Sequence, residues 1–133
     1  MNIIKKILFI DDQIECIEYV TSVLRNDDFN VIYAMDGEEG LKKAVSDRPD
    51  LIVLDVMMPE LNGWDICDKV RSIPEIANVP IVYLTCVEGP RTLYQTHGAF
   101  ETVWDEYITK PVRPKELLTV VKKLLQKSAA AGM

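Results

Sequence analysis

The sequence has 133 residues, enough for one domain with its own hydrophobic core. Apolar residues make up 48% of the chain and charged residues 27%, a composition that excludes disordered and fibrous proteins. The formal net charge of −6 argues against direct binding to nucleic acid or to an anionic membrane surface, because both are negatively charged.

The amino terminus resembles a signal peptide only superficially. Its apolar run at positions 7–10 ends at Asp11 and is too short for a signal sequence or a membrane span. The three cysteines Cys16, Cys67 and Cys86 are scattered and form no Cys-x-x-Cys pair, which favours a reducing compartment and thiols that fill small gaps in the core. We therefore expect a cytoplasmic protein that does not contact membranes.

Five short β-rich runs alternate with helical patterns along the chain. These runs are Ile7–Ile10, Val31–Tyr33, Leu51–Leu54, Ile81–Leu84 and Tyr107–Ile108. The first, third and fourth are continuously apolar, as in parallel strands that are covered on both faces. Strict alternation of strands with about five helices predicts an α/β fold, a single doubly wound parallel sheet of five strands.

The helical patterns have recognisable starts. The clearest begin at Ile14, after the candidate N-cap Asp36, near Gly63 and at Pro114. The last pattern carries an apolar stripe up to Leu125. The segment 88–106 should hold a fourth helix, but its pattern is atypical and predicts no definite structure. We expect the domain to span residues 1–127 and residues 128–133 to form a flexible tail or an expression remnant.

Polar side chains follow four of the five strand runs. Asp11 and Asp12 follow the first run, Asp55 the third, Thr85 the fourth and Lys110 the fifth. Since the carboxyl ends of parallel strands meet at one edge of the sheet, these groups should lie together. Three neighbouring carboxylates repel one another, so the site needs Lys110 and a divalent cation such as Mg²⁺. With both present, a carboxylate could accept a phosphoryl group.

Taken in order, these residues resemble the receiver domain of two-component response regulators, the CheY-like family. The resemblance rests on Asp11-Asp12, on the segment 54–63, on Thr85 and on the segment 107–111, and it extends from about Lys5 to Leu125. It implies a flavodoxin-like fold with the strand order 2-1-3-4-5.

The resemblance also implies a metal site. Asp55 corresponds to the phosphoacceptor of the family. Asp12, Asp55 and the backbone carbonyl of Met57 would bind Mg²⁺ directly, with Mn²⁺ as the alternative ion, while Asp11 would act mostly through bound water.

A second group of roles concerns the phosphoryl oxygens and the switch. The resemblance implies that Thr85 and Lys110 hold these oxygens and that Tyr107 is the aromatic switch residue. It also implies a cis peptide bond between Lys110 and Pro111. Phosphorylation would then change the surface formed by helix four, strand five and helix five.

The implied donor is a sensor histidine kinase or a phosphotransfer protein, and the implied output is an unidentified protein or a phosphorylation-dependent dimer. Whether such a chain counts as an enzyme is a matter of naming, because the acceptor is the protein itself.

One alternative is a degenerate receiver that acts only as an interaction module. A phosphatase-type hydrolase would need a second acid two positions after Asp55, where Met57 stands. A dinucleotide binder would need a G-x-G-x-x-G loop, which the sequence lacks.

Overall fold

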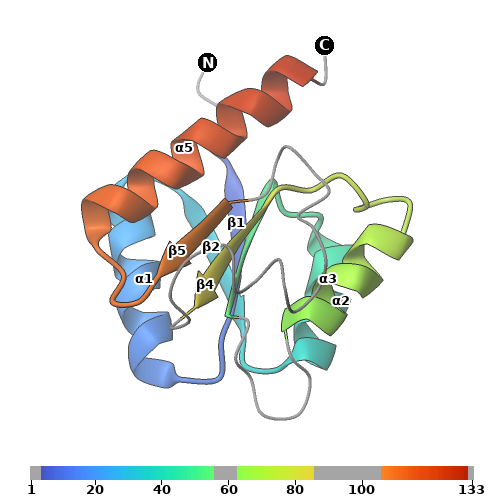
Figure 1. Cartoon of the computed structure of the whole chain (residues 1–133), viewed down its shortest axis with the longest axis horizontal. Helices are drawn as coiled ribbons and strands as arrows, with labels where there is room; N and C mark the ends of the chain where they lie inside the picture. The colour runs from blue at the N-terminus through green and yellow to red at the C-terminus, as the bar shows by residue number, and fades with distance from the viewer. Residues whose placement is uncertain (1–3, 56–62, 86–105, 132–133) are drawn as a thin grey trace.

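The structure is a computed structural model that describes residues 4–55, 63–85 and 106–131. Five parallel strands form one sheet in the order β2-β1-β3-β4-β5 (Figure 1). The strands are β1 (Lys6–Ile10), β2 (Asn30–Ala34), β3 (Leu51–Asp55), β4 (Ile81–Thr85) and β5 (Glu106–Thr109). The predicted fold class and strand order are confirmed, and each strand contains the run that predicted it.

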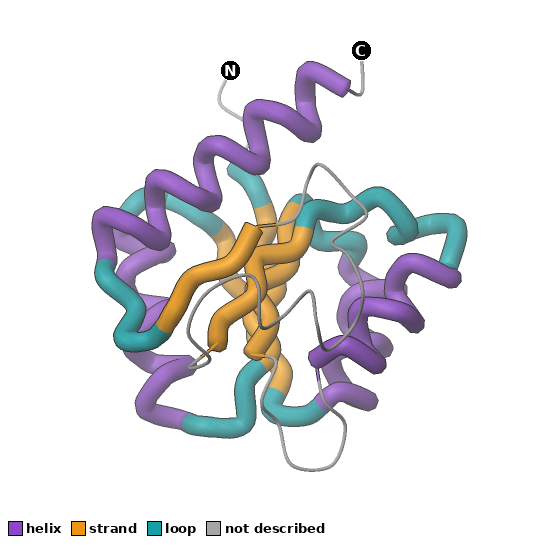
Figure 2. The backbone as a smooth tube through the Cα atoms, in the orientation of Figure 1, coloured by secondary structure: helices purple, strands orange, loops and turns teal. Residues whose placement is uncertain are grey.

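Four helices in the described part of the chain cover the two faces of this sheet. They are α1 (Ile14–Asn26), α2 (Gly37–Asp47), α3 (Gly63–Ser72) and α5 (Pro114–Ala131). Helices α1 and α5 lie on one side of the sheet and α2 and α3 on the other, as the tube trace also shows (Figure 2). The helix expected within 88–106 falls outside the described residues. None of the described helices combines the length and apolar character needed to cross a membrane.

Alternating residues of β1 contribute to two separate cores, one on each face of the sheet. Ile7 and Phe9 of β1 pack in the cluster that includes the buried faces of α1 and α5. Leu8 and Ile10 pack in the other cluster, with residues of α2 and α3. All four side chains are fully buried. Because successive side chains of a strand point to opposite faces, one apolar run supplies both layers, as predicted for a strand covered on both sides.

Helix α2 begins at the N-cap that the sequence predicts. The Asp36 carboxylate accepts a hydrogen bond of 2.7 Å from the backbone N–H of Glu39. The Glu39 carboxylate in turn accepts one of 3.1 Å from the backbone N–H of Met35. The first bond satisfies a donor that the first turn of a helix leaves free, and the second ties that turn to the residue before the N-cap, so together they fix the direction in which α2 leaves β2.

Charged side chains cover the outer edge of β2. Alternate residues of this strand bond to β1, which leaves the backbone of Val31 and Tyr33 facing away from the sheet. Arg25 of α1 donates a hydrogen bond of 3.0 Å to the Val31 carbonyl. Lys43 of α2 donates one of 2.5 Å to the Tyr33 carbonyl and lies 5.5 Å from the centre of the Tyr33 ring. Cations from both sheet faces therefore occupy the outward carbonyls of this edge strand.

The last helix is longer than the sequence analysis expects. Residues 128–131, assigned there to a flexible tail, continue α5 to Ala131. Three consecutive alanines explain the difference, since alanine has the highest intrinsic helix propensity. The division of the chain into a domain at 1–127 and a tail stays a prediction.

Candidate functional site at the carboxyl edge of the sheet

Two neighbouring strands bring the acidic residues together. Asp11 directly follows β1, and Asp55 is the last residue of β3, which pairs with β1 in parallel register. The exposed fractions of Asp11 and Asp55 are 0% and 2%, whereas Asp12 is half-buried. One carboxylate oxygen from each of the three residues lies within 4.8 Å of the others. The predicted acidic cluster is thus present in the described part of the chain.

Asp11 is held rigidly, yet one of its oxygens lacks a hydrogen bond. Its backbone N–H donates to the Ala34 carbonyl at 3.1 Å, and its Oδ1 accepts from the backbone N–H of Gln13 at 3.0 Å. Its buried Oδ2 has no hydrogen-bond partner among the described residues. Burial raises the pKa of Asp11, and the negative charge of Asp55 adds to this against the opposing effects of hydrogen bonds and of Lys110. The environment therefore disfavours the ionised form of Asp11 unless a cation is added.

Lys110 supplies the cation that the sequence predicts. Its Nζ lies 3.2 Å from Oδ2 of Asp55, to which it donates a hydrogen bond, and 3.8 Å from Oδ2 of Asp11. Burial lowers the pKa of Lys110, but the attraction of Asp55 and Asp11 outweighs it, so the pKa is raised overall. The lysine therefore remains charged. The peptide bond between Lys110 and Pro111 is cis, as predicted.

Cys16 belongs to the surroundings of this site, which the sequence analysis missed. It packs against the core cluster of α1 and α5, as predicted for a core filler, and from the first turn of α1 its half-buried thiol also interacts with Asp11. Burial, followed by the contact with Asp11, raises the pKa of Cys16 to about 12, so the thiol stays neutral. The available signal was its place in the first turn of the helix that follows Asp11 and Asp12, although that place does not fix the direction of the thiol. Cys67 is also half-buried, with its Sγ 2.8 Å from the Tyr83 hydroxyl.

The remaining predicted residues are described only in part. Thr85 ends β4, and its backbone is in register with Thr109 of β5. The Thr85 side chain and all of Met57 and Cys86 lie outside the described residues. Tyr107 is half-buried and packs against the core cluster on the α2 and α3 side of the sheet. The roles of Thr85, Tyr107 and Met57 stay predictions.

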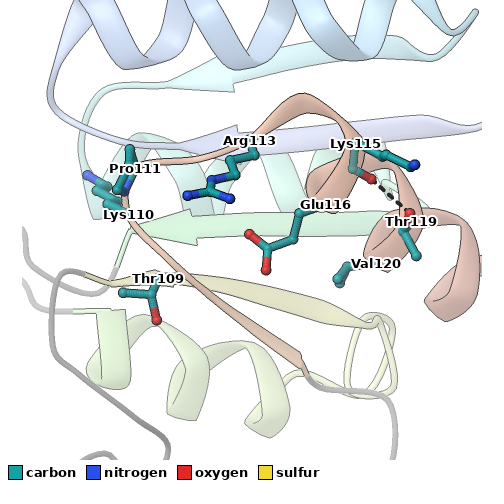
Figure 3. A pocket seen from close by; sticks show the side chains of 8 residues that line it. All are labelled: Thr109, Lys110, Pro111, Arg113, Lys115, Glu116, Thr119 and Val120. Atoms are coloured by element: carbon teal, nitrogen blue, oxygen red, sulfur yellow. Dashed lines mark hydrogen bonds between the residues drawn. The ribbon is translucent and has the colours of Figure 1, made fainter.

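Lys110 also borders a second feature, a pocket of about 610 Å³ beside β5 and the start of α5. Figure 3 shows the side chains that line it, among them those of Lys110, Arg113 and Glu116. Thr119, also in the pocket wall, donates a hydrogen bond of 2.8 Å to the Lys115 carbonyl of the same helix. The same lysine thus joins the acidic cluster to the surface of β5 and α5.

The donor set fits a hard divalent cation. Asp11, Asp12 and Asp55 offer only oxygen atoms, which suit Mg²⁺ better than softer metals. Among the described residues the buried Oδ2 of Asp11 has no hydrogen-bond partner, as expected of an oxygen that a cation, or water bound to it, would satisfy.

Comparison with known proteins identifies the family. The profile of the response regulator receiver domain matches residues 7–122. The chain is 40% identical over 130 residues to the alkaline phosphatase synthesis transcriptional regulatory protein PhoP of Bacillus subtilis. This match covers 96% of this chain and 51% of PhoP. It is 37% identical over 124 residues to the DNA-binding response regulator MtrA of Mycobacterium tuberculosis. That match covers 93% of this chain and 52% of MtrA.

A solved structure agrees with these sequence relationships. The chemotaxis response regulator CheY4 of Vibrio cholerae superposes with a TM-score of 0.83 at 30% identity, covering 92% of this chain and 99% of CheY4. The chain therefore belongs to the receiver domain family of two-component response regulators, as the sequence analysis expects. It spans about half the length of the curated relatives PhoP and MtrA.

Proposed function

We propose that this chain accepts a phosphoryl group on Asp55 from a sensor histidine kinase or a phosphotransfer protein, with Mg²⁺ as cofactor. The observation that carries the proposal is the contact of 3.2 Å between the Lys110 ammonium and a buried Asp55 oxygen inside a cluster of three carboxylates. Receiver domains typically accept phosphoryl groups and bind Mg²⁺, so family membership supports the same proposal.

In the proposed reaction an Asp55 oxygen attacks the phosphorus atom of a phosphohistidine. A bond between Asp55 oxygen and phosphorus forms while the bond between phosphorus and the histidine nitrogen breaks, and that nitrogen keeps the electron pair. Asp11 and Asp12, with Asp55, would hold Mg²⁺, which when bound neutralises negative charge on the transferred group.

Lys110 and Thr85 would act on the phosphoryl oxygens. The Lys110 ammonium already contacts Asp55, so it needs only a small movement to reach an oxygen of the phosphoryl group on that residue. The Thr85 hydroxyl would donate to another oxygen. Because Lys110 also lines the pocket beside α5, its movement offers a route from Asp55 to the surface of β5 and α5, where an output protein or a second copy of the chain would bind.

The proposal includes a cytoplasmic location, which Cys16 and Cys67 support because both are half-buried thiols outside any disulfide. The exclusion of direct nucleic-acid contact stays a prediction drawn from the net charge of −6. The comparisons give it no support, because one relative is named as a DNA-binding regulator and is about twice the length that this chain covers.

The test is intact-mass spectrometry after incubation with acetyl phosphate and MgCl₂. The parent should gain the mass of one phosphoryl group, and Asp55→Asn should gain none. Asp68→Asn, which changes an exposed aspartate of α3, is the matched control and should behave as the parent. A parent that gains no mass and does not bind beryllofluoride with Mg²⁺ would instead support the degenerate interaction module.

A further inference from the structure

A hydrogen bond between distant parts of the chain holds the loop that carries Lys110. The hydroxyl of Tyr19, in α1, donates to the backbone carbonyl of Val112 at 3.0 Å. Val112 follows Lys110 by two residues, whereas 93 positions separate it from Tyr19. The bond therefore joins the helix that follows Asp11 and Asp12 to the loop that follows β5.

The other contacts that the structure describes for this loop involve its two ends and the Val112 side chain. Its first residue, Lys110, directly follows β5, and its last residue, Arg113, accepts a hydrogen bond of 2.9 Å from the backbone N–H of Leu117 in α5. Between them, Val112 packs against the core cluster of α1 and α5. Its carbonyl is oriented by the Tyr19 hydroxyl.

Tyr19 contributes little to the core. Its exposed fraction is 43%, and its hydrogen bond to Val112 lies at the surface. Water can replace a surface hydroxyl as a hydrogen-bond donor at little cost in stability, but water is not attached to α1. Loss of the hydroxyl should therefore change the position of the loop more than the free energy of unfolding.

From this geometry we infer that Tyr19 is a positioning residue for Lys110. By fixing the carbonyl two residues beyond the lysine, it keeps the ammonium group within 3.8 Å of both Asp55 and Asp11 before a phosphoryl group arrives. This inference rests on the proposed function. Transfer reactions depend steeply on such positioning, since small displacements of a charged group weaken the stabilisation of the transition state.

The experiment compares Tyr19→Phe with Tyr33→Phe. Tyr33 lies on β2, at the opposite edge of the sheet from β5, and its exposed fraction of 41% matches that of Tyr19. The rate of phosphorylation by acetyl phosphate is measured at saturating MgCl₂, together with the Mg²⁺ affinity and the urea unfolding curve. The small donor is chosen because it needs no docking surface for a kinase.

The expected result is a split between transfer and metal binding. Tyr19→Phe should lower the maximal phosphorylation rate roughly three- to tenfold, the fold-change that corresponds to the net free energy of one hydrogen bond. Its Mg²⁺ affinity and its unfolding curve should match those of the parent, and Tyr33→Phe should match the parent in all three measurements.

Several results would overturn the inference. An unchanged phosphorylation rate in Tyr19→Phe would do so. A lower rate accompanied by equally lower Mg²⁺ affinity and stability would also do so, because it would indicate general damage to the protein. A defect seen only with a kinase donor would assign Tyr19 to docking instead. A parent that acetyl phosphate does not modify overturns the proposed function itself, and this inference with it, which separates the two failures.

Discussion

Nζ of Lys110 lies 3.8 Å from Oδ2 of Asp11, close enough for attraction between the charges but too far for a hydrogen bond. The same nitrogen does donate a hydrogen bond to Asp55, at 3.2 Å. Lys110 thus compensates one buried carboxylate more fully than the other. The partly compensated one, Asp11, is the residue whose pKa burial raises.

Asp11→Asn should stabilise the metal-free protein near neutral pH. Because the folded-state pKa of Asp11 is raised, its contribution to stability is greatest at acidic pH and is lost as the pH rises through that pKa. Removing the charge should raise the free energy of unfolding by on the order of 1 kcal/mol. Urea unfolding with and without MgCl₂ measures this, and the stabilisation that Mg²⁺ gives the parent should be largely lost. Destabilisation to the same extent under both conditions would contradict the account.

Lys110→Met should have the opposite effect. Asp11 and Asp55 would then repel each other without a nearby ammonium group, which should lower the free energy of unfolding of the metal-free protein by about 1–3 kcal/mol. MgCl₂ should raise the free energy of unfolding of Lys110→Met by more than it raises that of the parent. The control is Lys122→Met, which removes an exposed ion pair with Asp27 at 2.8 Å. It should cost less than about 1 kcal/mol and should not respond to Mg²⁺.

The double variant Arg25→Met/Lys43→Met should expose the edge of β2. Without these cations, the outward carbonyls of Val31 and Tyr33 become available to a strand of another molecule. Sedimentation velocity should then show concentration-dependent self-association that the parent lacks. Lys42→Met is the matched control, because Lys42 pairs with Glu38 on the exposed face of α2 at 3.6 Å. If the double variant sediments as the parent does, the two cations are not required to protect this edge.

Asp36→Ala should destabilise the protein through loss of an N-cap. The Asp36 carboxylate satisfies the backbone N–H of Glu39, and its removal should cost about 1 kcal/mol in thermal or urea unfolding. Gln13, the N-cap of α1, makes no side-chain capping bond, so Gln13→Ala should change stability much less. Equal losses in the two variants would show that the capping bond is not the cause.

The sequence predicts the sheet well because its signals are local. The continuous apolar runs at 7–10, 51–54 and 81–84 indicate strands covered on both faces, and the stripe that begins at Leu117 predicts the buried side of α5. The acidic cluster with Lys110 follows from topology, because parallel strands end at a common edge. These predictions need only the order of the elements.

What the sequence could not predict depends on side-chain directions between elements. Nothing in its periodicity pairs Tyr19 with Val112, places Arg25 on the carbonyl of Val31, or directs the Cys16 thiol to Asp11. Each contact depends on how α1 lies against the sheet, which is fixed by packing of the whole core. The sequence analysis also did not predict that α5 continues to Ala131, because the small residues after position 128 were taken as a flexible tail or an expression remnant although alanine favours helix.

The order of the strands also divides the site by local stability. Asp11 follows β1 and Asp55 ends β3, each of which has a strand on both sides. Lys110 follows β5, which among the described strands pairs with β4 alone. Edge segments open more readily than central ones, so the lysine should leave its place during fluctuations that keep the carboxylates fixed. The part of the site at β1 and β3 stays fixed and retains the oxygens proposed to bind the metal. The part at the end of β5 opens, and it borders the pocket beside α5. Amide hydrogen exchange should therefore be faster at Ile108 than at Phe9 or Val53, although all three side chains are buried.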